Sequence, residues 1–341
     1  MKKSTAILAA GGLGTALLMR ANRMRSPYSF QGKSVLITGG SRGLGLIMAR
    51  MLADAGACLT ILARSQEELD RAEQDLTSRG AEVLTLRRDV AKRDEAEDAV
   101  RSAVERFGGI DVLINNAGII QVGPVDHMKL EDFEEAMAIH MWGPLYTMQA
   151  AIPHMREQGG GRIVNISSIG GKIAVPHLLP YSASKFALVG LSDGMRAELA
   201  RDRIHVTTVA PGLMRTGSPP NAFFKGDRQR EYGWFLILGS VPLTSIDAER
   251  AAAQIIEACR NGDPELTITI QARLAILAST LFPGLFARSM QIYSRLLPGP
   301  VGPEGDESKT GWESQSSVAR LALVQPTYEA AEENNETIRR A

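Results

Sequence analysis

The stretch Thr38-Gly-Gly-Ser-Arg-Gly-Leu-Gly45 decides the fold. It follows the apolar run Val35-Leu-Ile-Thr38, which predicts a strand, and it leads into a helical pattern over 45–55. Glycine tolerates positive φ and lets a ligand approach the backbone closely. Since the first turn of a helix also presents unpaired N–H groups, a glycine-rich turn between strand and helix favours a bound phosphate group.

The segments on either side repeat the same alternation of short apolar runs and longer helical stretches. Such an alternation is typical of a parallel sheet with crossover helices. We therefore expect an α/β fold, a Rossmann-type doubly wound parallel sheet in a single domain. The further strands are expected at 57–62, 82–87, 112–115, 162–166 and 206–210, with helices at 66–79 and 91–106 between them.

Changes of composition divide the chain of 341 residues. Residues 31–265 are expected to form the folded catalytic domain, preceded by an apolar N-terminal segment at 1–30. Residues 266–297 form an apolar extension that is interrupted at Pro283-Gly284. This extension is expected either to contact a membrane or a partner, or to be a pair of helices covering the substrate end. Residues 298–341 are rich in Gly, Pro, Glu and Ser and predict a loosely ordered tail.

The overall composition excludes several classes of partner. A formal net charge of zero provides no field that would attract nucleic acid. Cys58 and Cys259 are the only cysteines, and their spacing indicates neither a disulfide framework nor a metal site. We therefore expect the protein to be located in a reducing compartment and to bind a small molecule.

The N-terminal segment has the pattern of a membrane-directed sequence. Lys2 and Lys3 precede an apolar run over 4–19, and arginines follow it. No small-x-small cleavage site precedes those arginines, so an uncleaved anchor is favoured over a signal peptide. An apolar helix that packs on the domain or on a partner subunit is the alternative. If the segment is an anchor, we expect the domain to lie on the cytoplasmic face of a membrane, where NADPH is available.

Downstream motifs accompany the glycine-rich turn, namely Asp89-Val90, Asn115-Asn-Ala-Gly118 and Tyr181-x-x-x-Lys185. Together they resemble the short-chain dehydrogenase/reductase family over most of the chain. The resemblance implies a nicotinamide dinucleotide whose diphosphate lies on the turn and whose adenine contacts Asp89. It also places the carboxamide on Pro211-Gly212 and Thr216. The expected cofactor residues are Gly39, Ser41, Arg42, Gly43, Leu44, Gly45, Arg64, Asp89, Val90, Asn116, Ala117, Gly118, Tyr181, Lys185, Pro211, Gly212 and Thr216.

The end of the second expected strand predicts which dinucleotide binds. NAD enzymes place a carboxylate there for the ribose hydroxyls. This chain instead has Leu62-Ala-Arg-Ser65, and Arg42 in the turn offers a second guanidinium group. Two arginines can bind a ribose 2′-phosphate, and we expect no acid beside them to repel it. NADP(H) is therefore the expected cofactor, and an NAD-linked alcohol dehydrogenase is the alternative.

The residues expected to be catalytic are Ser168, Tyr181 and Lys185, with His140 beside them. Tyr181 and Lys185 are four apart, which puts them on one face of a helix. An adjacent ammonium and a cationic nicotinamide would bring the phenol pKa toward neutrality, so Tyr181 is expected to donate a proton. The resemblance implies that Ser168, thirteen residues earlier, is the hydroxyl that shares the charge of the carbonyl oxygen.

His140 departs from the family pattern, in which an asparagine supports a water that links the lysine to solvent. We expect the ring nitrogens of His140 to replace this relay. A histidine without a catalytic role is the alternative. If His140 instead slows or abolishes turnover, the chain is a catalytically weak or inactive, membrane-attached NADP-binding sensor or scaffold.

Aromatic and aliphatic side chains dominate the expected substrate loop between Leu213 and Ile246. They predict a lipophilic lid over a fatty acyl, sterol or similar carbonyl or alcohol substrate, with a dimer contact as the alternative. The resemblance also implies a homodimer or homotetramer built on the helices around 133–149 and 181–199. The lid residues are Phe223, Phe224, Trp234, Phe235, Leu236, Ile237 and Leu238.

Overall fold

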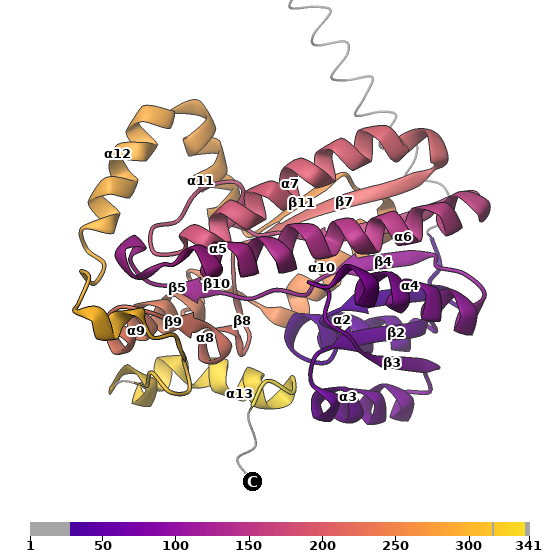
Figure 1. Cartoon of the computed structure of the whole chain (residues 1–341), viewed down its shortest axis with the longest axis horizontal. Coiled ribbons are helices and arrows are strands. Elements are labelled where there is room, and N and C mark those ends of the chain that lie inside the picture. The colour runs from indigo at the N-terminus through magenta and orange to yellow at the C-terminus, as the bar shows by residue number, and fades with distance from the viewer. Residues whose placement is uncertain (1–27, 316, 338–341) are drawn as a thin grey trace, which may run out of the picture.

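The computed structural model describes residues 28–315 and 317–337, and its centre is a seven-stranded sheet. The strand order is β11-β7-β6-β4-β1-β2-β3, and every neighbouring pair is parallel. This confirms the expected α/β fold (Figure 1). The strands are β1 (Ser34–Thr38), β2 (Cys58–Ala63), β3 (Val83–Arg87), β4 (Val112–Asn115), β6 (Gly161–Ile166), β7 (Ile204–Pro211) and β11 (Glu265–Ile268).

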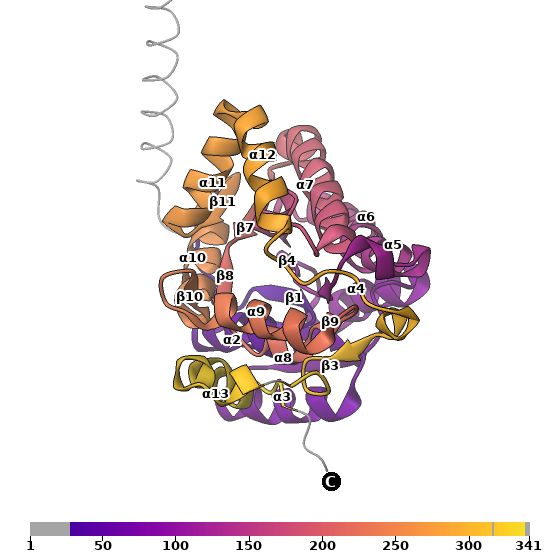
Figure 2. The ribbon, with the colours of Figure 1, turned by 90° about the vertical axis from the view of Figure 1, so that its left-hand side faces the viewer.

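Helices cover both faces of the sheet, because consecutive strand residues are apolar on both sides. Val35 and Ile37 of β1 pack into one core with helices α2, α3 and α10, whereas Leu36 between them packs into a second core on the other face. Figure 2 shows the two helical layers on either side of the strands. The helices are α2 (Gly43–Asp54), α3 (Gln66–Ser78), α4 (Arg93–Phe107), α5 (Leu130–Met137), α6 (Gly143–Glu157), α7 (Leu179–Leu199) and α10 (Ala248–Asn261).

One strand of the seven-stranded sheet was not expected. β11 begins at Glu265, where the composition indicated the end of the domain, and it pairs with β7 along its whole length. Its four residues, Glu-Leu-Thr-Ile, alternate between polar and apolar as a strand does, but we had placed the end of the domain at this point. The sheet therefore extends into the chain that we had assigned to the extension.

Three of the seven residues of the expected lid are buried within this chain, and the other four are half-buried. They form β9 (Phe223–Phe224) and α9 (Arg228–Ser240), and Phe224, Phe235 and Leu236 pack into a third core with Val324 of the C-terminal region. Small elements surround this core: β5 (Gln121–Val122), β8 (Leu213–Arg215), α8 (Ser218–Asn221), β10 (Ser245–Asp247) and β12 (Lys309–Thr310). A dimer contact through these three buried side chains is thus not available.

The C-terminal region differs from the loosely ordered tail indicated by its composition. β12 pairs with β9, and α13 (Gln325–Glu333) packs beside α9. The hydroxyls of Tyr232 and Tyr328 lie 2.6 Å apart, as do those of Ser240 and Thr327. A few buried contacts with distant residues hold this segment, and composition alone cannot reveal them.

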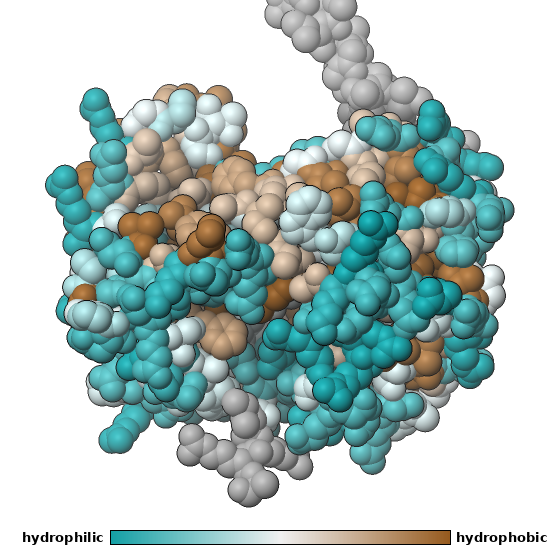
Figure 3. Space-filling view, in the orientation of Figure 1, coloured by the Kyte–Doolittle hydropathy of each residue, from teal (hydrophilic) through white to brown (hydrophobic). Residues whose placement is uncertain are grey.

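Two apolar helices, α11 (Ile270–Leu281) and α12 (Pro283–Ser294), project from the domain and meet at Pro283-Gly284 (Figure 1). Most of their large side chains face solvent, and Figure 3 shows apolar residues gathered on this part of the molecule. Within the described residues, no helix has the length and apolar character needed to cross a bilayer. The expected N-terminal anchor falls almost entirely within 1–27, outside the described residues. The exposed apolar side chains are Ile270, Leu274, Leu277, Leu281, Phe282, Leu285, Ile292 and Leu296.

Candidate active site

The glycine-rich turn after β1 leaves no room for side chains at two of its glycines. Gly39 has φ of +64°, and a Cβ there would lie 2.9 Å from the Cα of Ala117. A Cβ on Gly45 would lie 2.0 Å from the carbonyl oxygen of Gly39. Asn116 completes the fit, because its amide donates to the carbonyls of Thr38 and Gly39 at 3.2 and 3.0 Å. The structure thus brings the turn and the Asn-Ala-Gly motif together, as their motif set predicts.

The first turn of α2 is the natural place for an anionic group. The helix begins at Gly43, whose φ is +53°, and the side chain of Arg42 does not cap it. The N–H groups of Gly43, Leu44 and Gly45 have no partner within the helix, and the helix dipole adds partial positive charge. The donor set and the crowded glycines fit a dinucleotide diphosphate, which these residues would hold.

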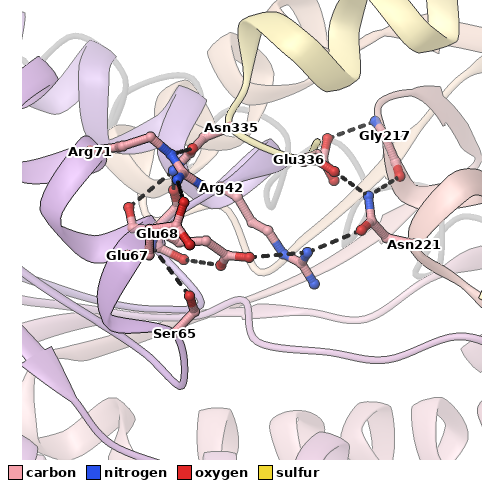
Figure 4. Close-up of polar contacts among 10 residues, drawn as sticks. Arg42, Ser65, Glu67, Glu68, Arg71, Gly217, Asn221, Asn335 and Glu336 are labelled. Carbon is pink, nitrogen blue, oxygen red and sulfur yellow. Dashed lines mark hydrogen bonds and ion pairs between the residues drawn. The ribbon is translucent and has the colours of Figure 1, made fainter. Parts of the chain in front are cut away.

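The adjacent corner, where a ribose 2′-phosphate would bind, contains an acid, so our expectation of none is wrong. Ser65 caps α3 by accepting from the N–H of Glu68 at 3.3 Å, and this turn directs Glu68 toward the glycine-rich turn. The Glu68 carboxylate accepts from the Ser41 hydroxyl at 3.0 Å and pairs with Arg42 at 3.4 Å (Figure 4). Arg64 is exposed and has no ion pair with any described residue. One of the two arginines is therefore already partly neutralised.

The remaining predicted cofactor residues lie around the same edge of the sheet. Asp89 accepts from the N–H of Ala91 at 3.0 Å. A Cβ on Gly143 would lie 3.0 Å from the carbonyl oxygen of Val90. Beyond β7, which ends at Pro211, a Cβ on Gly212 would lie 2.9 Å from the Thr269 hydroxyl. Thr216 is buried, and its hydroxyl donates to Ser218 at 2.7 Å.

The predicted catalytic residues converge from two elements. Ser168 follows the end of β6, whereas Tyr181 and Lys185 lie on α7. A Cβ on Gly170 would lie 3.1 Å from the Tyr181 ring and 3.5 Å from the Ser168 hydroxyl, so these side chains are neighbours. The Lys185 Nζ lies 5.7 Å from the Tyr181 ring centre. Lys185 donates to the carbonyl of Ile166 at 2.8 Å, which holds the amine at the end of β6. Ser167 faces the other way, and its hydroxyl donates to the Lys185 carbonyl at 3.1 Å.

Burial sets the protonation of these groups. It raises the pKa of Tyr181, and the hydrogen bond from Ser168 acts in the opposite direction. It also lowers the pKa of Lys185 to about 7, so near neutral pH a large share of the amine is uncharged. Desolvation thus reduces the share of Lys185 that is charged, and with it the effect that we expected the ammonium to have on the Tyr181 pKa. With its pKa raised, the Tyr181 phenol keeps its proton near neutral pH.

His140 lies in a single π-helical turn (Ala138–Trp142) between α5 and α6. Its Nε2 accepts from the N–H of Ile119 at 3.1 Å, so the proton resides on Nδ1, which contacts the Ser184 hydroxyl at 2.8 Å. Ser184 in turn donates to the Tyr181 carbonyl at 2.9 Å. Burial holds the His140 pKa well below its ordinary value, and Lys185 adds to this effect. Both ring nitrogens therefore already have partners, and the neutral ring positions the start of α7.

A buried polar network behind the site was not anticipated. Asn115 of β4 donates to Asn165 of β6 at 2.8 Å, and Asn165 donates to Ser192 of α7 at 2.8 Å. Thr147 of α6 donates to Asn115 at 2.7 Å. The chain of hydrogen bonds fixes α6 and α7 relative to the strands that end at the site. Its sequence signal is an asparagine in the apolar run of each strand; we had assigned Asn115 to the Asn-Asn-Ala-Gly motif and Asn165 only to its strand.

Comparison with known proteins gives consistent matches. A model of the short chain dehydrogenase family matches residues 33–223. Dehydrogenase/reductase SDR family member 7B of Danio rerio is 32% identical over 300 residues, which are 86% of this chain and 96% of that protein. Gluconate 5-dehydrogenase of Gluconobacter oxydans is 35% identical over 189 residues, 55% of this chain and 74% of that protein. The crystal structure of L-sorbose reductase from Gluconobacter frateurii, complexed with NADPH and L-sorbose, superposes with a TM-score of 0.64 at 25% identity, covering 71% of this chain and 97% of that one.

The burial of Lys185 generates a pH-dependent stability. Since its pKa is about 7 in the folded chain and 10.5 in a free lysine, the unfolded chain binds more protons between these values. The free energy of unfolding therefore rises with pH in this window. We expect Lys185→Met to be more stable than the wild type by a few kcal/mol at about pH 6, with the difference shrinking toward about pH 10. Urea unfolding at both pH values measures it, with the exposed Lys129→Met as control. A difference that does not change with pH would contradict the prediction.

Proposed function

Because the chain belongs to the short-chain dehydrogenase/reductase family of oxidoreductases, which act on alcohol and carbonyl groups, we propose that it is an NADP(H)-dependent enzyme. Its substrate is a lipophilic ketone or aldehyde, or the corresponding alcohol. The observation that carries the proposal is the convergence of Ser168, Tyr181 and Lys185 beside the glycine-rich turn. A crowded turn alone binds a nucleotide, but a buried phenol beside a hydroxyl and an amine can also protonate a carbonyl oxygen.

In the reductive direction, NADPH would supply, when bound, the hydride for the carbonyl carbon. Tyr181 gives its phenolic proton to the carbonyl oxygen, and the raised pKa keeps that proton available. Ser168 donates a hydrogen bond to the same oxygen and stabilises its growing negative charge. Lys185 lies behind the phenol and returns a proton to it, because its pKa near 7 lets the amine gain and lose a proton at working pH.

The preference for NADP(H) is supported by Arg64 and Arg42. Arg64 is exposed at the start of α3, and a 2′-phosphate would compete with Glu68 for Arg42. L-sorbose reductase, whose solved structure contains NADPH, shares the fold. Release of Glu68 from Arg42 is thus part of the proposed binding step.

Helices α11 and α12 support attachment to an anionic bilayer surface. Their exposed face is apolar, and residues 266–303 contain no acid but three arginines, Arg273, Arg288 and Arg295. Apolar side chains flanked by arginines match the interface between acyl chains and anionic headgroups. We propose that this hairpin rests on the cytoplasmic face of a membrane, from which a lipophilic substrate would reach the enzyme.

A homodimer or homotetramer is also proposed. Trp142 lies at the start of α6, and Leu179 and Phe186 lie on α7, the helices on which the assembly is expected. All three large apolar side chains are exposed, which favours a covered face in the assembly.

The central prediction is tyrosine-dependent turnover of NADPH. With long-chain and cyclic ketones, we expect Tyr181→Phe to lower kcat by about 10²-fold or more, because the proton donor is lost. Steady-state NADPH oxidation measures it, and Tyr146→Phe on the surface of α6 is the matched control. Equal rates for the wild type and Tyr181→Phe would contradict the proposal. If NADPH binds but no ketone is reduced, and His140→Asn restores turnover, the chain is instead an NADP-binding protein with a blocked site.

The second prediction concerns the cofactor. Arg64→Asp should raise the Kd for NADPH by about tenfold or more, because a cation is replaced by an anion beside the 2′-phosphate. The Kd for NADH should stay nearly constant. Fluorescence titration measures both, with Arg201→Asp in the exposed turn after α7 as control. Unchanged affinity for NADPH would support an NAD-linked alcohol dehydrogenase.

The third prediction concerns the apolar hairpin. Leu285 is 70% exposed on α12, and Leu130 is 68% exposed on α5. In protein lacking residues 1–27, Leu285→Glu should weaken binding to vesicles with anionic lipids by about tenfold, because one leucine would no longer be buried in the bilayer. Leu130→Glu should have no effect. Vesicle co-sedimentation measures both, and equal binding by the two variants would reject the membrane contact in favour of a protein partner.

A further inference from the structure

The end of the described chain lies on the glycine-rich turn. After α13, residues Asn334, Asn335 and Glu336 run between the first turn of α2 and the turn after β8, and we call these three residues the strap. Figures 1 and 2 both show α13 beside α3, at the edge where the turn lies. Figure 4 shows Asn335 beside Arg71 and Glu336 beside Gly217, with the predicted cofactor residue Arg42 between the two groups.

The strap uses backbone N–H groups that a diphosphate would need. The N–H of Gly43, the first residue of α2, donates to the carbonyl of Asn334 at 2.9 Å. The N–H of Gly217, next to Thr216, donates to the Glu336 carboxyl at 2.6 Å. A Cβ placed on Gly43 would lie 2.9 Å from Oε1 of Glu336, so the carboxyl lies directly against the turn. A phosphate group bound to this helix end would occupy the same space.

Further contacts tie the strap to the predicted 2′-phosphate corner. The amide of Asn335 donates to the carbonyls of Ser41 and Glu68 at 2.8 and 3.0 Å, and its oxygen accepts from Arg71. The strap thus connects the glycine-rich turn to α3, on the side where Glu68 already holds Arg42. These contacts are polar, and a bound anion can replace them.

The Glu336 carboxyl is an unfavourable occupant of this position. It is 6% exposed, and burial raises its pKa to about 7, although Arg42 and the Gly217 N–H act in the opposite direction. Arg42 pairs with Glu68, and among the described residues no cation forms an ion pair with the Glu336 carboxyl. A diphosphate placed beside it would add like charge in a buried site. The Glu336 carboxyl is therefore better solvated once it has moved away from the glycine-rich turn.

We propose that the strap is autoinhibitory: it occupies the diphosphate position, and the dinucleotide binds only by displacing Asn334 and Glu336 from Gly43 and Gly217. This inference rests on the proposed nucleotide site and adds that the chain's own C-terminal region competes for it. The apparent affinity for NADPH is then reduced by the fraction of molecules in which the strap is closed.

The test is an NADPH titration of the full chain and its variants by fluorescence. Glu336→Ala should lower the Kd for NADPH by about tenfold, because the closed strap loses the hydrogen bond from the Gly217 N–H to the Glu336 carboxyl. Glu336→Gln keeps the shape and an acceptor and should give a smaller decrease, which also provides a second variant if the alanine variant folds poorly. Glu332→Ala, an exposed glutamate on α13, removes the same side chain and should leave the Kd unchanged.

Hydrogen exchange adds a readout of strap position. NADPH should speed exchange of the Glu336 N–H, which bonds the Ala331 carbonyl at 2.8 Å in the closed strap. An unchanged or weaker affinity of Glu336→Ala, or slower exchange with NADPH, would overturn the inference and make the strap part of the bound site. If neither the wild type nor any variant binds NADPH or NADH, the proposed nucleotide site itself is rejected, together with the strap.

Discussion

The structure depends on the contact between the glycine-rich turn and the Asn-Ala-Gly turn after β4. A side chain on Gly39 would collide with Ala117, and one on Gly45 would collide with the carbonyl of Gly39. Because no side chain separates them, Asn116 reaches two carbonyls of the turn, and α2 starts directly at the edge of the sheet. The carboxyl ends of the central strands then meet beside a helix N-terminus, which is the geometry that parallel α/β sheets use for nucleotides.

The proposed catalytic residues lie at the same edge because a second set of buried contacts fixes α7. Asn165 reaches Ser192 from within β6, and Lys185 donates to Ile166 at the end of that strand. His140 holds Ser184, one residue before Lys185. Buried polar groups of this kind specify one arrangement of the helix and the strands, because each group has a partner of defined geometry. The phenol of Tyr181 is thus positioned by contacts made one turn further along its own helix.

The C-terminal region connects the binding site to the rest of the molecule. Its path from the exposed hairpin of α11 and α12, through β12, to α13 passes the third core and ends on α2. One continuous segment therefore joins an apolar surface, the substrate side and the cofactor turn. Acidic residues occupy both halves of the proposed cofactor site, Glu68 at the proposed 2′-phosphate corner and Glu336 at the proposed diphosphate position.

The sequence by itself determined the fold class, the position of most strands and the residues that come together at the sheet edge. This succeeded because glycine requirements, strand periodicity and the Tyr-x-x-x-Lys spacing are local properties of the chain. Only the tertiary structure decided that Glu68 contacts Arg42, that both nitrogens of His140 have partners, and that Glu336 lies on Gly43. Each of these results depends on a side chain meeting a group far away in the sequence or across a turn. Burial, which sets the pKa of Lys185 and of Glu336, likewise exists only once distant segments have packed together.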